Sequence, residues 1–388
     1  MKIAVTHPRQ SWLGGTERYL NHLSAYLAEK GHRVTIICRH HESPPHPDVN
    51  FITLKPVGIG VGHRNWRWAK AVERNVAEKE YDVVIGLGRT WSQDIYRLGG
   101  GCHRSYYEMV HRVMNHKIKQ FLTLSIIKHT LYNAIEKKAL STLFDQKIVC
   151  NSKMVKADIQ ARYRIPESHI SVIYNGVDLE HFHPGHRNGK GLKLRRKCGF
   201  KDDEFVILFL GNGYKRKGLD LLLPAFRTIS KNRPDARLLV VGRDKNINWY
   251  KSLGRNLNIQ DRTIFIGKQK DVAACYNAAD LYVLPTRYDP FANSTLEAMA
   301  CGLPAVTTRR NGASELIVEG IHGSVIGIDE AELVRQLHYW SVNGRAETAG
   351  VNARQLSEKH GIETKMADFY HLIEETCKTK SRWKHNLN

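Results

Sequence analysis

The chain repeats one local pattern in both of its halves: a short apolar strand, a glycine loop and an amphipathic helix. In the first half, the apolar segment Lys2–Thr6 precedes the loop of residues 11–17 (S-W-L-G-G-T-E) and a helical pattern over residues 18–30. In the second half, Phe205–Leu210 precedes residues 211–218 (G-N-G-Y-K-R-K-G) and another helical pattern. This order is typical of parallel α/β folds, because each helix returns the chain to the start of the next parallel strand.

Further predicted strands alternate with helical patterns in each half. They are residues 34–38 and 82–86 in the first half, and residues 237–241, 263–266, 281–284 and 305–307 in the second. We therefore predict an α/β fold of two Rossmann-like domains, at residues 1–174 and 175–364, followed by a helix at residues 365–388. The basic, glycine-rich residues 186–197 are predicted to be an exposed linker.

Composition narrows the class of protein. The 388 residues are 42% hydrophobic and 25% charged, which is usual for a globular protein of two domains. Neither a signal peptide nor a charge-free apolar run long enough for a transmembrane helix is found, and the seven cysteines form no C-x-x-C pair, so a reducing cytoplasm is expected. The net charge of +21 suits nucleic acid, an anionic membrane surface or a phosphorylated substrate.

Two carboxylates follow the predicted strand at residues 281–284. Asp289 lies in a short loop, and Glu297 is predicted in the first turn of a helix that opens near Ser294. The carboxyl end of a parallel strand and a helix start favour anionic ligands. We expect Glu297 to accept hydrogen bonds from sugar hydroxyls and Asp289 to face the reacting sugar. The alternative is that Glu297 only complements the helix dipole.

Other candidate ligand contacts follow other predicted strands. Glycines without Cβ atoms let a diphosphate approach backbone N–H groups, and cations neutralise its charge. The alternatives are an ordinary turn for the glycine pair and a solvated basic turn for the cations. The candidates are Gly14 and Gly15 after the first strand, and Arg216 and Lys217 after residues 205–210. Gly242, Lys268 and Val272 follow the next two strands, and by position they are expected to line the nucleotide base pocket, mostly through backbone groups.

Residues 288–304, Y-D-P-F-A-N-S-T-L-E-A-M-A-C-G-L-P, resemble the signature of the retaining family 4 glycosyltransferases. The family usually has Glu where this chain has Asp289, and an Arg where it has Asn212, a charge that Arg216 is expected to replace. The resemblance implies a GT-B fold, in which the two domains face each other across a deep cleft and the C-terminal helix returns to the first domain. It also implies a nucleotide-sugar donor, no metal and no other cofactor. The donor would bind through Asn293, Ser294, Thr295, Leu296, Glu297 and the glycines and cations above.

His103 and Asp94 are the candidate groups for the chemistry in the first domain. Residues 88–104 (G-R-T-W-S-Q-D-I-Y and, after a gap, G-G-G-C-H-R) resemble the subgroup that adds glucose to heptose in the lipopolysaccharide inner core. The resemblance places His103 beside the transferred sugar, while Asp94 would bind or deprotonate the acceptor hydroxyl. The alternatives are a structural His103, and an N-cap or surface role for Asp94.

Residues 106–140 alternate helix-spaced apolar residues with Lys and Arg, as expected for a basic amphipathic helix on an anionic membrane. The alternative is a surface helix packed on its own domain. With the subgroup resemblance, this segment predicts a peripheral enzyme at the inner face of the cytoplasmic membrane, with UDP-glucose as donor and a lipid-linked saccharide as acceptor. Alternatives are another lipid-linked or polysaccharide acceptor, a UDP-sugar 2-epimerase, and a nucleic-acid-binding protein. No nucleic-acid partner is expected, because acidic residues at the ligand-facing strand end repel phosphodiesters.

Overall fold

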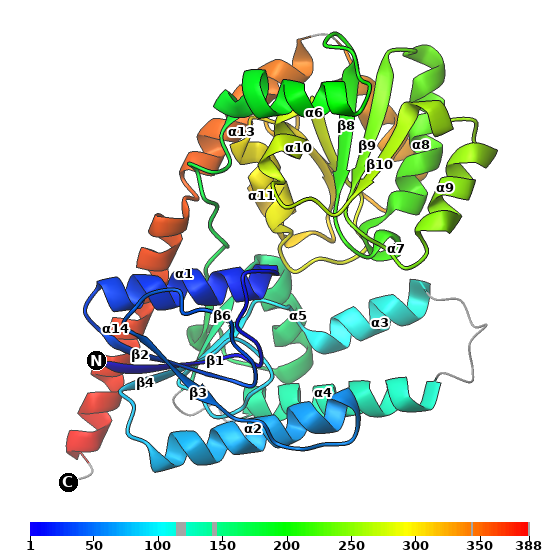
Figure 1. The fold of residues 1–388 in the computed structure, drawn as a ribbon. Helices are drawn as coiled ribbons and strands as arrows, with labels where there is room; N and C mark the ends of the chain where they lie inside the picture. The colour runs from blue at the N-terminus through cyan, green and yellow to red at the C-terminus, as the bar shows by residue number, and fades with distance from the viewer. Residues whose placement is uncertain (114–121, 142–145, 343, 387–388) are drawn as a thin grey trace. The chain divides into compact units, whose positions relative to one another are not determined.

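The computed structural model describes residues 1–113, 122–141, 146–342 and 344–386. The chain divides into two compact units (Figure 1). Unit 1 comprises residues 1–174 and 363–388, and unit 2 comprises residues 175–362. Each unit is a parallel sheet with helices packed on it.

Unit 1 contains a seven-stranded parallel sheet in the order β3-β2-β1-β4-β5-β6-β7. The chain starts in the middle of this sheet, builds one side and then crosses back to build the other, as in Rossmann-like folds. The strands are β1 (Lys2–Thr6), β2 (Arg33–Cys38), β3 (Val49–Thr53), β4 (Val83–Gly86), β5 (Ile95–Leu98), β6 (Lys147–Cys150) and β7 (Ile170–Val172).

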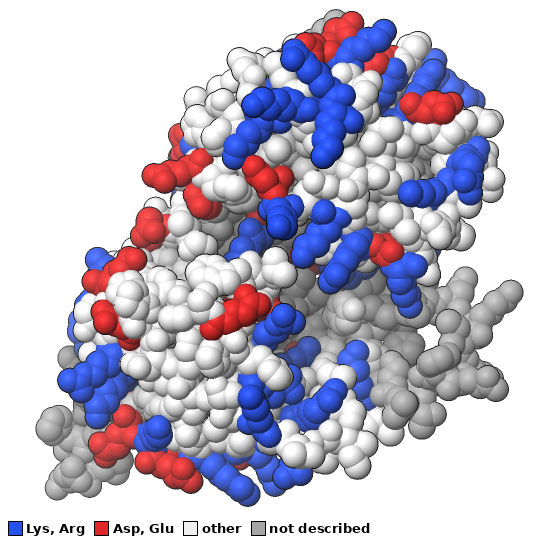
Figure 2. Space-filling model, in the orientation of Figure 1, with Lys and Arg blue, Asp and Glu red and all other residues white. Residues whose placement is uncertain are grey.

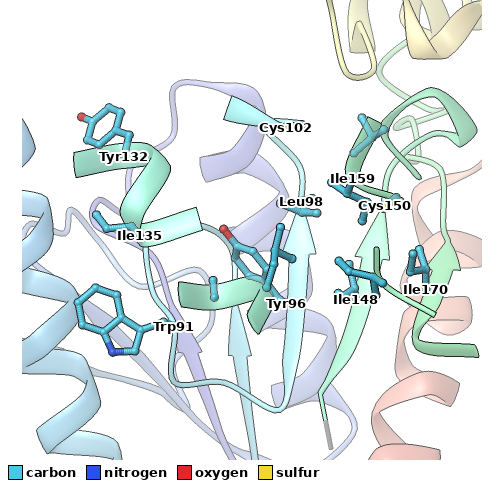
Figure 3. Close-up of a cluster of buried hydrophobic side chains, with 14 of the residues drawn as sticks. Trp91, Tyr96, Leu98, Cys102, Tyr132, Ile135, Ile148, Cys150, Ile159 and Ile170 are labelled. Atoms are coloured by element: carbon cyan, nitrogen blue, oxygen red, sulfur yellow. The ribbon is translucent and has the colours of Figure 1, made fainter. Parts of the chain in front are cut away.

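The helices of unit 1 contact this sheet or one another. They are α1 (Gly15–Glu29), α2 (Gly60–Glu78), α3 (His103–Val113), α4 (Leu122–Ser141), α5 (Lys153–Tyr163) and α14 (Ile362–Asn386). Part of the core is the cluster in Figure 3, where Tyr96 and Leu98 of β5 and Ile148 of β6 lie among side chains of α4 and α5.

The C-terminal helix α14 belongs to unit 1, although most of it follows unit 2 in the sequence. Its Phe369 ring packs edge-on against Tyr19 of α1, with ring centroids 6.1 Å apart. Its Tyr370 hydroxyl lies 2.9 Å from His32 Nε2. The expectation that the C-terminal helix returns to the first domain is confirmed.

Unit 2 contains a six-stranded parallel sheet in the order β10-β9-β8-β11-β12-β13. Its strands are β8 (Phe205–Leu210), β9 (Ala236–Val241), β10 (Thr263–Gly267), β11 (Leu281–Leu284), β12 (Ala305–Thr308) and β13 (Gly323–Ile326). Its helices are α6 (Leu192–Lys197), α7 (Tyr214–Lys217), α8 (Leu219–Asn232), α9 (Ile247–Asn256), α10 (Ala273–Asn277), α11 (Asn293–Ala300), α12 (Glu330–Trp340) and α13 (Arg345–Glu358). Both sheets confirm the predicted α/β class and the two Rossmann-like domains of the GT-B fold.

The prediction that residues 186–197 are a linker is wrong, although most of these residues are exposed as expected. These residues form a π-helical turn (Arg187–Gly191) and α6 inside unit 2. The Arg195 side chain is 3% exposed, and its guanidinium donates to the Asp280 carboxylate at 2.6 Å and to the Ala278 carbonyl at 2.8 Å. These contacts hold Arg195 of the basic segment inside unit 2.

The predicted basic helix over residues 106–140 is two helices, α3 and α4, and residues 114–121 lie outside the described part of the chain. Within that part, α4 packs against α2 and α3. In the residues that the structure describes, no helix combines the length and the apolar character needed to cross a bilayer.

Candidate active site

The candidate site of unit 2 lies at the carboxyl ends of β8 and β11. These two strands are neighbours in the sheet. After β8 the chain continues to β9 on one side, whereas after β11 it continues to β12 on the other side. Ligands of open α/β sheets bind at such a switch point. The short helix α7 after β8 provides Arg216 and Lys217, and the loop after β11 provides Asp289.

Glycines allow these loops to approach one another. Gly218 has a φ of +83°, and a Cβ there would lie 2.0 Å from the Pro285 carbonyl oxygen. Gly242, a predicted ligand contact after β9, has a φ of +120°, and its Cβ would lie 2.0 Å from the Gly211 oxygen. A side chain at either position would push the loops apart. Both positions therefore require glycine for the close approach of the backbone, whether or not a ligand binds.

Asp289 is the centre of a buried ion cluster. Its Oδ2 accepts hydrogen bonds from Lys217 Nζ at 2.6 Å and from Arg216 Nη1 at 2.8 Å, and Arg216 Nη1 also donates to the Tyr288 carbonyl at 3.0 Å. The side chains of Lys217 and Asp289 are 8% and 12% exposed. Arg216 therefore lies beside Lys217 as a second cation. This position agrees with the expectation that Arg216 replaces the arginine absent at Asn212.

The ion cluster sets the charge states of its members. Burial alone would raise the pKa of Asp289, but the Lys217 ammonium and the Arg216 guanidinium together lower it. Burial lowers the pKa of Lys217, against the opposing effect of the Asp289 carboxylate. The group carries one negative and two positive charges when all three side chains are ionised, which suits an anionic ligand.

Glu297 lies in the second turn of α11, so its predicted place in the first turn is wrong. The helix begins at Asn293, one residue earlier than expected. Glu297 is buried, with 6% of the residue exposed. Its Oε2 accepts a hydrogen bond from the Tyr276 hydroxyl at 2.8 Å. Burial and the Glu297 charge raise the pKa of Tyr276 well above its ordinary value, so Tyr276 keeps its proton and donates it.

Asn311, which was not predicted from the sequence, organises the loop before α11. It is fully buried; its Oδ1 accepts from the N–H groups of Ala292 (3.0 Å) and Ala313 (3.1 Å). Its Nδ2 donates to the hydroxyls of Thr295 (2.9 Å) and Thr307 (3.0 Å). The dipeptide Asn311-Gly312 after β12 is typical of a turn. The hydrogen-bond partners of the Asn311 side chain lie up to 19 residues away in the sequence, so local pattern does not indicate them.

Replacing Asn311 by alanine is expected to destabilise unit 2 by about 2–4 kcal/mol, because two buried N–H groups lose their acceptor. Urea unfolding followed by circular dichroism measures the change, with the exposed Asn232→Ala at the end of α8 as control. An unfolding midpoint equal to that of the wild type would contradict this prediction, because it would show that water replaces the amide at no cost.

The remaining donor-site candidates of unit 2 fall into two groups. Near α11, Ser294 Oγ lies 2.7 Å from the Tyr282 hydroxyl, Asn293 Oδ1 accepts from Asn175 Nδ2 at 2.6 Å, and Leu296 is buried. After β10, Lys268 is exposed and Val272 precedes α10 as its N-cap residue. The structure brings Asn293, Ser294, Thr295 and Glu297 together on one helix.

Asn212 stands where the family usually has an arginine. Its Oδ1 accepts a hydrogen bond from the Arg243 N–H at 3.0 Å. This contact ties the loop after β8 to the loop after β9 beside Gly242. Asn212 therefore has a structural role here.

Unit 1 holds a second candidate site, a cavity of about 520 Å³ at the carboxyl ends of β4 and β5. Its lining includes His7, Thr16, Arg89, His103, Lys128 and Tyr132. Gly14 and Gly15 adjoin this cavity, because Thr16 follows them directly at the start of α1. Gly14 has a φ of +104°, which an L side chain rarely adopts.

His103 begins α3 and is held by two buried contacts. Its backbone N–H donates to Glu136 Oε2 at 2.6 Å, and its Nε2 lies 2.9 Å from His129 Nδ1. Burial, and then the charges of Arg89 and Lys128, lower the pKa of His103 to about 3. A neutral imidazole has one donor and one acceptor nitrogen, so His103 contributes hydrogen bonds without a charge.

Arg89 is the other notable residue of this cavity. Its φ of +67° is uncommon for a residue with a side chain, and such backbone strain is concentrated at functional sites. Its guanidinium lies 3.7 Å from the centre of the Tyr132 ring. The cavity therefore combines a strained cation, an aromatic ring and a neutral imidazole.

Asp94 lies away from this cavity, contrary to its predicted contact with an acceptor. It precedes β5, whereas His103 follows the carboxyl end of the same strand, and a strand of four residues separates the two edges by about 13 Å. The Asp94 carboxylate accepts from the Val84 N–H at 2.7 Å and from Lys380 Nζ at 2.9 Å. Asp94 thus fastens α14 to the sheet.

Comparisons with known families agree with this geometry. Residues 13–181 match the family model described as Glycosyltransferase Family 4, and residues 192–355 match the model described as Glycosyl transferases group 1. The protein is a glycosyltransferase with the GT-B fold. The chain belongs to the family 4 glycosyltransferases.

Individual relatives span most of the chain. It is 26% identical over 323 residues, or 80% of each sequence, to an uncharacterized glycosyltransferase of Methanocaldococcus jannaschii. It is 25% identical to the lipopolysaccharide glucosyltransferase WaaG of Escherichia coli K12, over 81% of this chain and 82% of the relative. The crystal structure of WaaG matches with a TM-score of 0.80 at 22% identity, over 96% of this chain and 99% of that one. A structure of Anabaena HepE in complex with UDP and glucose matches with a TM-score of 0.68 at 20% identity, over 96% and 99% of the two chains.

Proposed function

We propose that the protein is a retaining, metal-independent glycosyltransferase that moves glucose from UDP-glucose to a heptose of the lipopolysaccharide inner core. It would act as a peripheral enzyme at the inner face of the cytoplasmic membrane, on a lipid-linked acceptor. The observation that carries the proposal is the pair of cations, Lys217 and Arg216, on Asp289 at the carboxyl ends of β8 and β11. The likeness to WaaG supports the acceptor, and the UDP and glucose in HepE support the donor.

The donor diphosphate would bind to Lys217 and Arg216. An ammonium has three N–H donors and a guanidinium has five, and Asp289 accepts one from each side chain. Their positive charges would neutralise the phosphate that departs with the nucleoside. In this chain Lys and Arg side chains thus take the part that a metal ion plays in other transferases.

The sugar and ribose would be recognised by carboxylates. Glu297 would accept hydrogen bonds from the ribose hydroxyls, held in place by the Tyr276 hydroxyl. Asp289 would contact the transferred sugar and, with its negative charge, stabilise positive charge that develops on the ring. Retention would follow from attack on the same face that the phosphate leaves, with the phosphate taking the proton of the acceptor hydroxyl.

The acceptor would bind in the cavity of unit 1. His103 supplies a neutral hydrogen-bonding group there, and Arg89 and Lys128 supply positive charge. These cations suit the acidic sugars and phosphates of a lipopolysaccharide core. The alternative is the same reaction on another lipid-linked saccharide. The test below distinguishes the two by comparing UDP release with and without the heptose acceptor.

The test measures UDP release from UDP-glucose in EDTA, with and without a lipopolysaccharide acceptor truncated to heptose. Wild type should release UDP only with the acceptor, and Glu297→Gln should lower kcat/KM for the donor by about 10- to 100-fold, the value of a hydrogen bond to a charged group. The exposed Glu347→Gln is the control, because it removes the same charge from the surface of α13. NMR of the product should show the α-anomer of the donor retained.

Each arm has its own contrary outcome. Release without acceptor that still depends on Glu297 would retain the donor site and reject the heptose. Loss of turnover in EDTA, restored by a divalent cation, would reject metal independence. No release with any nucleotide sugar would reject the proposal.

A further inference from the structure

The segment before α2 exposes large apolar side chains to solvent. Val57 is 80% exposed, Ile59 is 89% exposed and Val61 is 49% exposed. The segment is not loose: the Ile59 N–H donates to His63 Nδ1 at 3.1 Å, and Gly60 makes the turn into α2 with a φ of +70°. The turn thus keeps the two valines and the isoleucine exposed to solvent.

A row of cations continues from this segment along α2. Arg64, Arg67, Lys70 and Arg74 are exposed. At 100° per residue these four positions fall within about 120° of one another, on one side of the helix. Trp68 and Val72 on the opposite side are fully buried in the core of unit 1. Figure 2 shows Lys and Arg side chains on the lower part of the face it presents, where Figure 1 places α2.

A groove joins the apolar segment to the cations. Its volume is about 390 Å³, and its lining includes Pro56, His63, Trp66, Arg67, Lys70 and Arg74. Among the described residues that line it, none carries a carboxylate. Glu73 lies on the same helix, but its Oε1 accepts a hydrogen bond from Lys138 Nζ at 3.1 Å. The groove therefore suits an anionic group attached to something apolar.

The same segment forms part of the wall of the unit 1 cavity. Val61 lines that cavity together with His103 and Lys128. The next residue, Gly62, packs against α4 so closely that a Cβ would lie 2.9 Å from Lys128 Cα. The exposed apolar segment thus borders the unit 1 cavity at Val61.

We infer that residues 56–61 and the cations Arg64, Arg67, Lys70 and Arg74, here called the docking surface, bind an anionic phospholipid bilayer. Val57 and Ile59 insert among the acyl chains, and the groove takes a phosphate headgroup. A bilayer explains both features together, because free phosphate would need the cations and leave the apolar side chains without a role. The inference builds on the proposed membrane location and names the surface responsible, which differs from residues 106–140.

The test is co-sedimentation with vesicles of phosphatidylcholine containing 30% phosphatidylglycerol, and with phosphatidylcholine alone. Arg67→Gln/Lys70→Gln should lower the partition coefficient on anionic vesicles about 25-fold, since each cation at such a surface contributes about fivefold. Val57→Ser/Ile59→Ser should lower it by at least as much. All four positions are exposed, so the variants are expected to fold like the wild type.

Two matched controls lie on unit 2. Lys251→Gln/Arg255→Gln on α9 removes the same net charge, and Val318→Ser/Val351→Ser removes exposed apolar side chains. Both should bind vesicles like the wild type. Equal losses in the controls would show that net charge or general hydrophobicity drives binding, and would overturn the inference.

Other outcomes are also decisive. Wild type that binds neither vesicle, or docking-surface variants that bind like the wild type, would overturn it. So would release of the protein from vesicles by millimolar inorganic phosphate at constant ionic strength, which would identify a free-phosphate site. UDP release with a detergent-dispersed acceptor, measured on the same samples, should be unchanged in the variants. Absence of release in the wild type would count against the proposed function and leave the vesicle result standing.

Discussion

Replacing Lys217 by methionine is expected to lower kcat/KM for the nucleotide sugar by about 10²- to 10³-fold, the usual cost of removing one charged donor from a reacting centre. Lys217 Nζ is buried and lies 2.6 Å from Asp289, at the switch point between β8 and β11. Most of the loss should appear in kcat, because negative charge on the leaving diphosphate grows as the sugar departs. Steady-state rates of UDP release over a range of donor concentrations separate kcat from KM.

Lys215→Met is the matched control. Lys215 is two residues away on α7, but its side chain is 53% exposed and pairs with Asp220 at 2.6 Å. Removing an exposed ion pair changes stability by less than about 1 kcal/mol and should leave turnover unchanged. Equal activity of Lys217→Met and the wild type would contradict the placement of the diphosphate. A loss of similar size in Arg216→Gln would support the view that Arg216 supplies the charge absent at Asn212.

The central strands of unit 2 could be predicted from the sequence, because their side chains are apolar or aromatic throughout. β8 and β11 begin and end at the predicted residues. β5 was missed, since Arg97 interrupts its apolar run. The structure buries Arg97 at 2% exposure, with its guanidinium 3.5 Å from the centre of the Tyr19 ring. A cation with a partner 78 residues away gives no local sign that it belongs in a strand.

The same limit applies to the candidate site. Asp289 and Lys217 were identified because each follows a predicted strand, and the order of the strands makes them neighbours. Asn311 and Tyr276 were missed, because each acts through a hydrogen bond to a residue that local pattern does not connect with it. Residues 186–197 were misread for this reason as well, since Arg187 and Arg195 pair with the distant Asp280. Local periodicity identifies the strands and loops, whereas buried polar pairs require the fold.

Replacing Asp289 by asparagine is expected to destabilise unit 2 by about 3 kcal/mol at pH 7, because the buried Lys217 ammonium loses its anionic partner. This is the lower end of the range for one partner of a buried pair, since the amide oxygen can still accept a hydrogen bond. The same change should lower kcat by about a hundredfold, because the carboxylate beside the transferred sugar is lost. Urea unfolding and UDP release measure the two effects, with the exposed Asp203→Asn as control.

The stability difference between wild type and Asp289→Asn should depend on pH in a defined direction. The cations hold the pKa of Asp289 in the folded chain below its ordinary value of 3.8. Unfolded chains therefore bind more protons near that pH, and the stability from the ionised carboxylate is fully present above it and lost as the pH falls through the folded pKa. The difference should stay constant from pH 7 to pH 5 and narrow only below about pH 4. Narrowing that already begins near pH 6 would mean that burial outweighs the two cations and raises the pKa, and the ion cluster would then not hold an ionised Asp289 at the donor site.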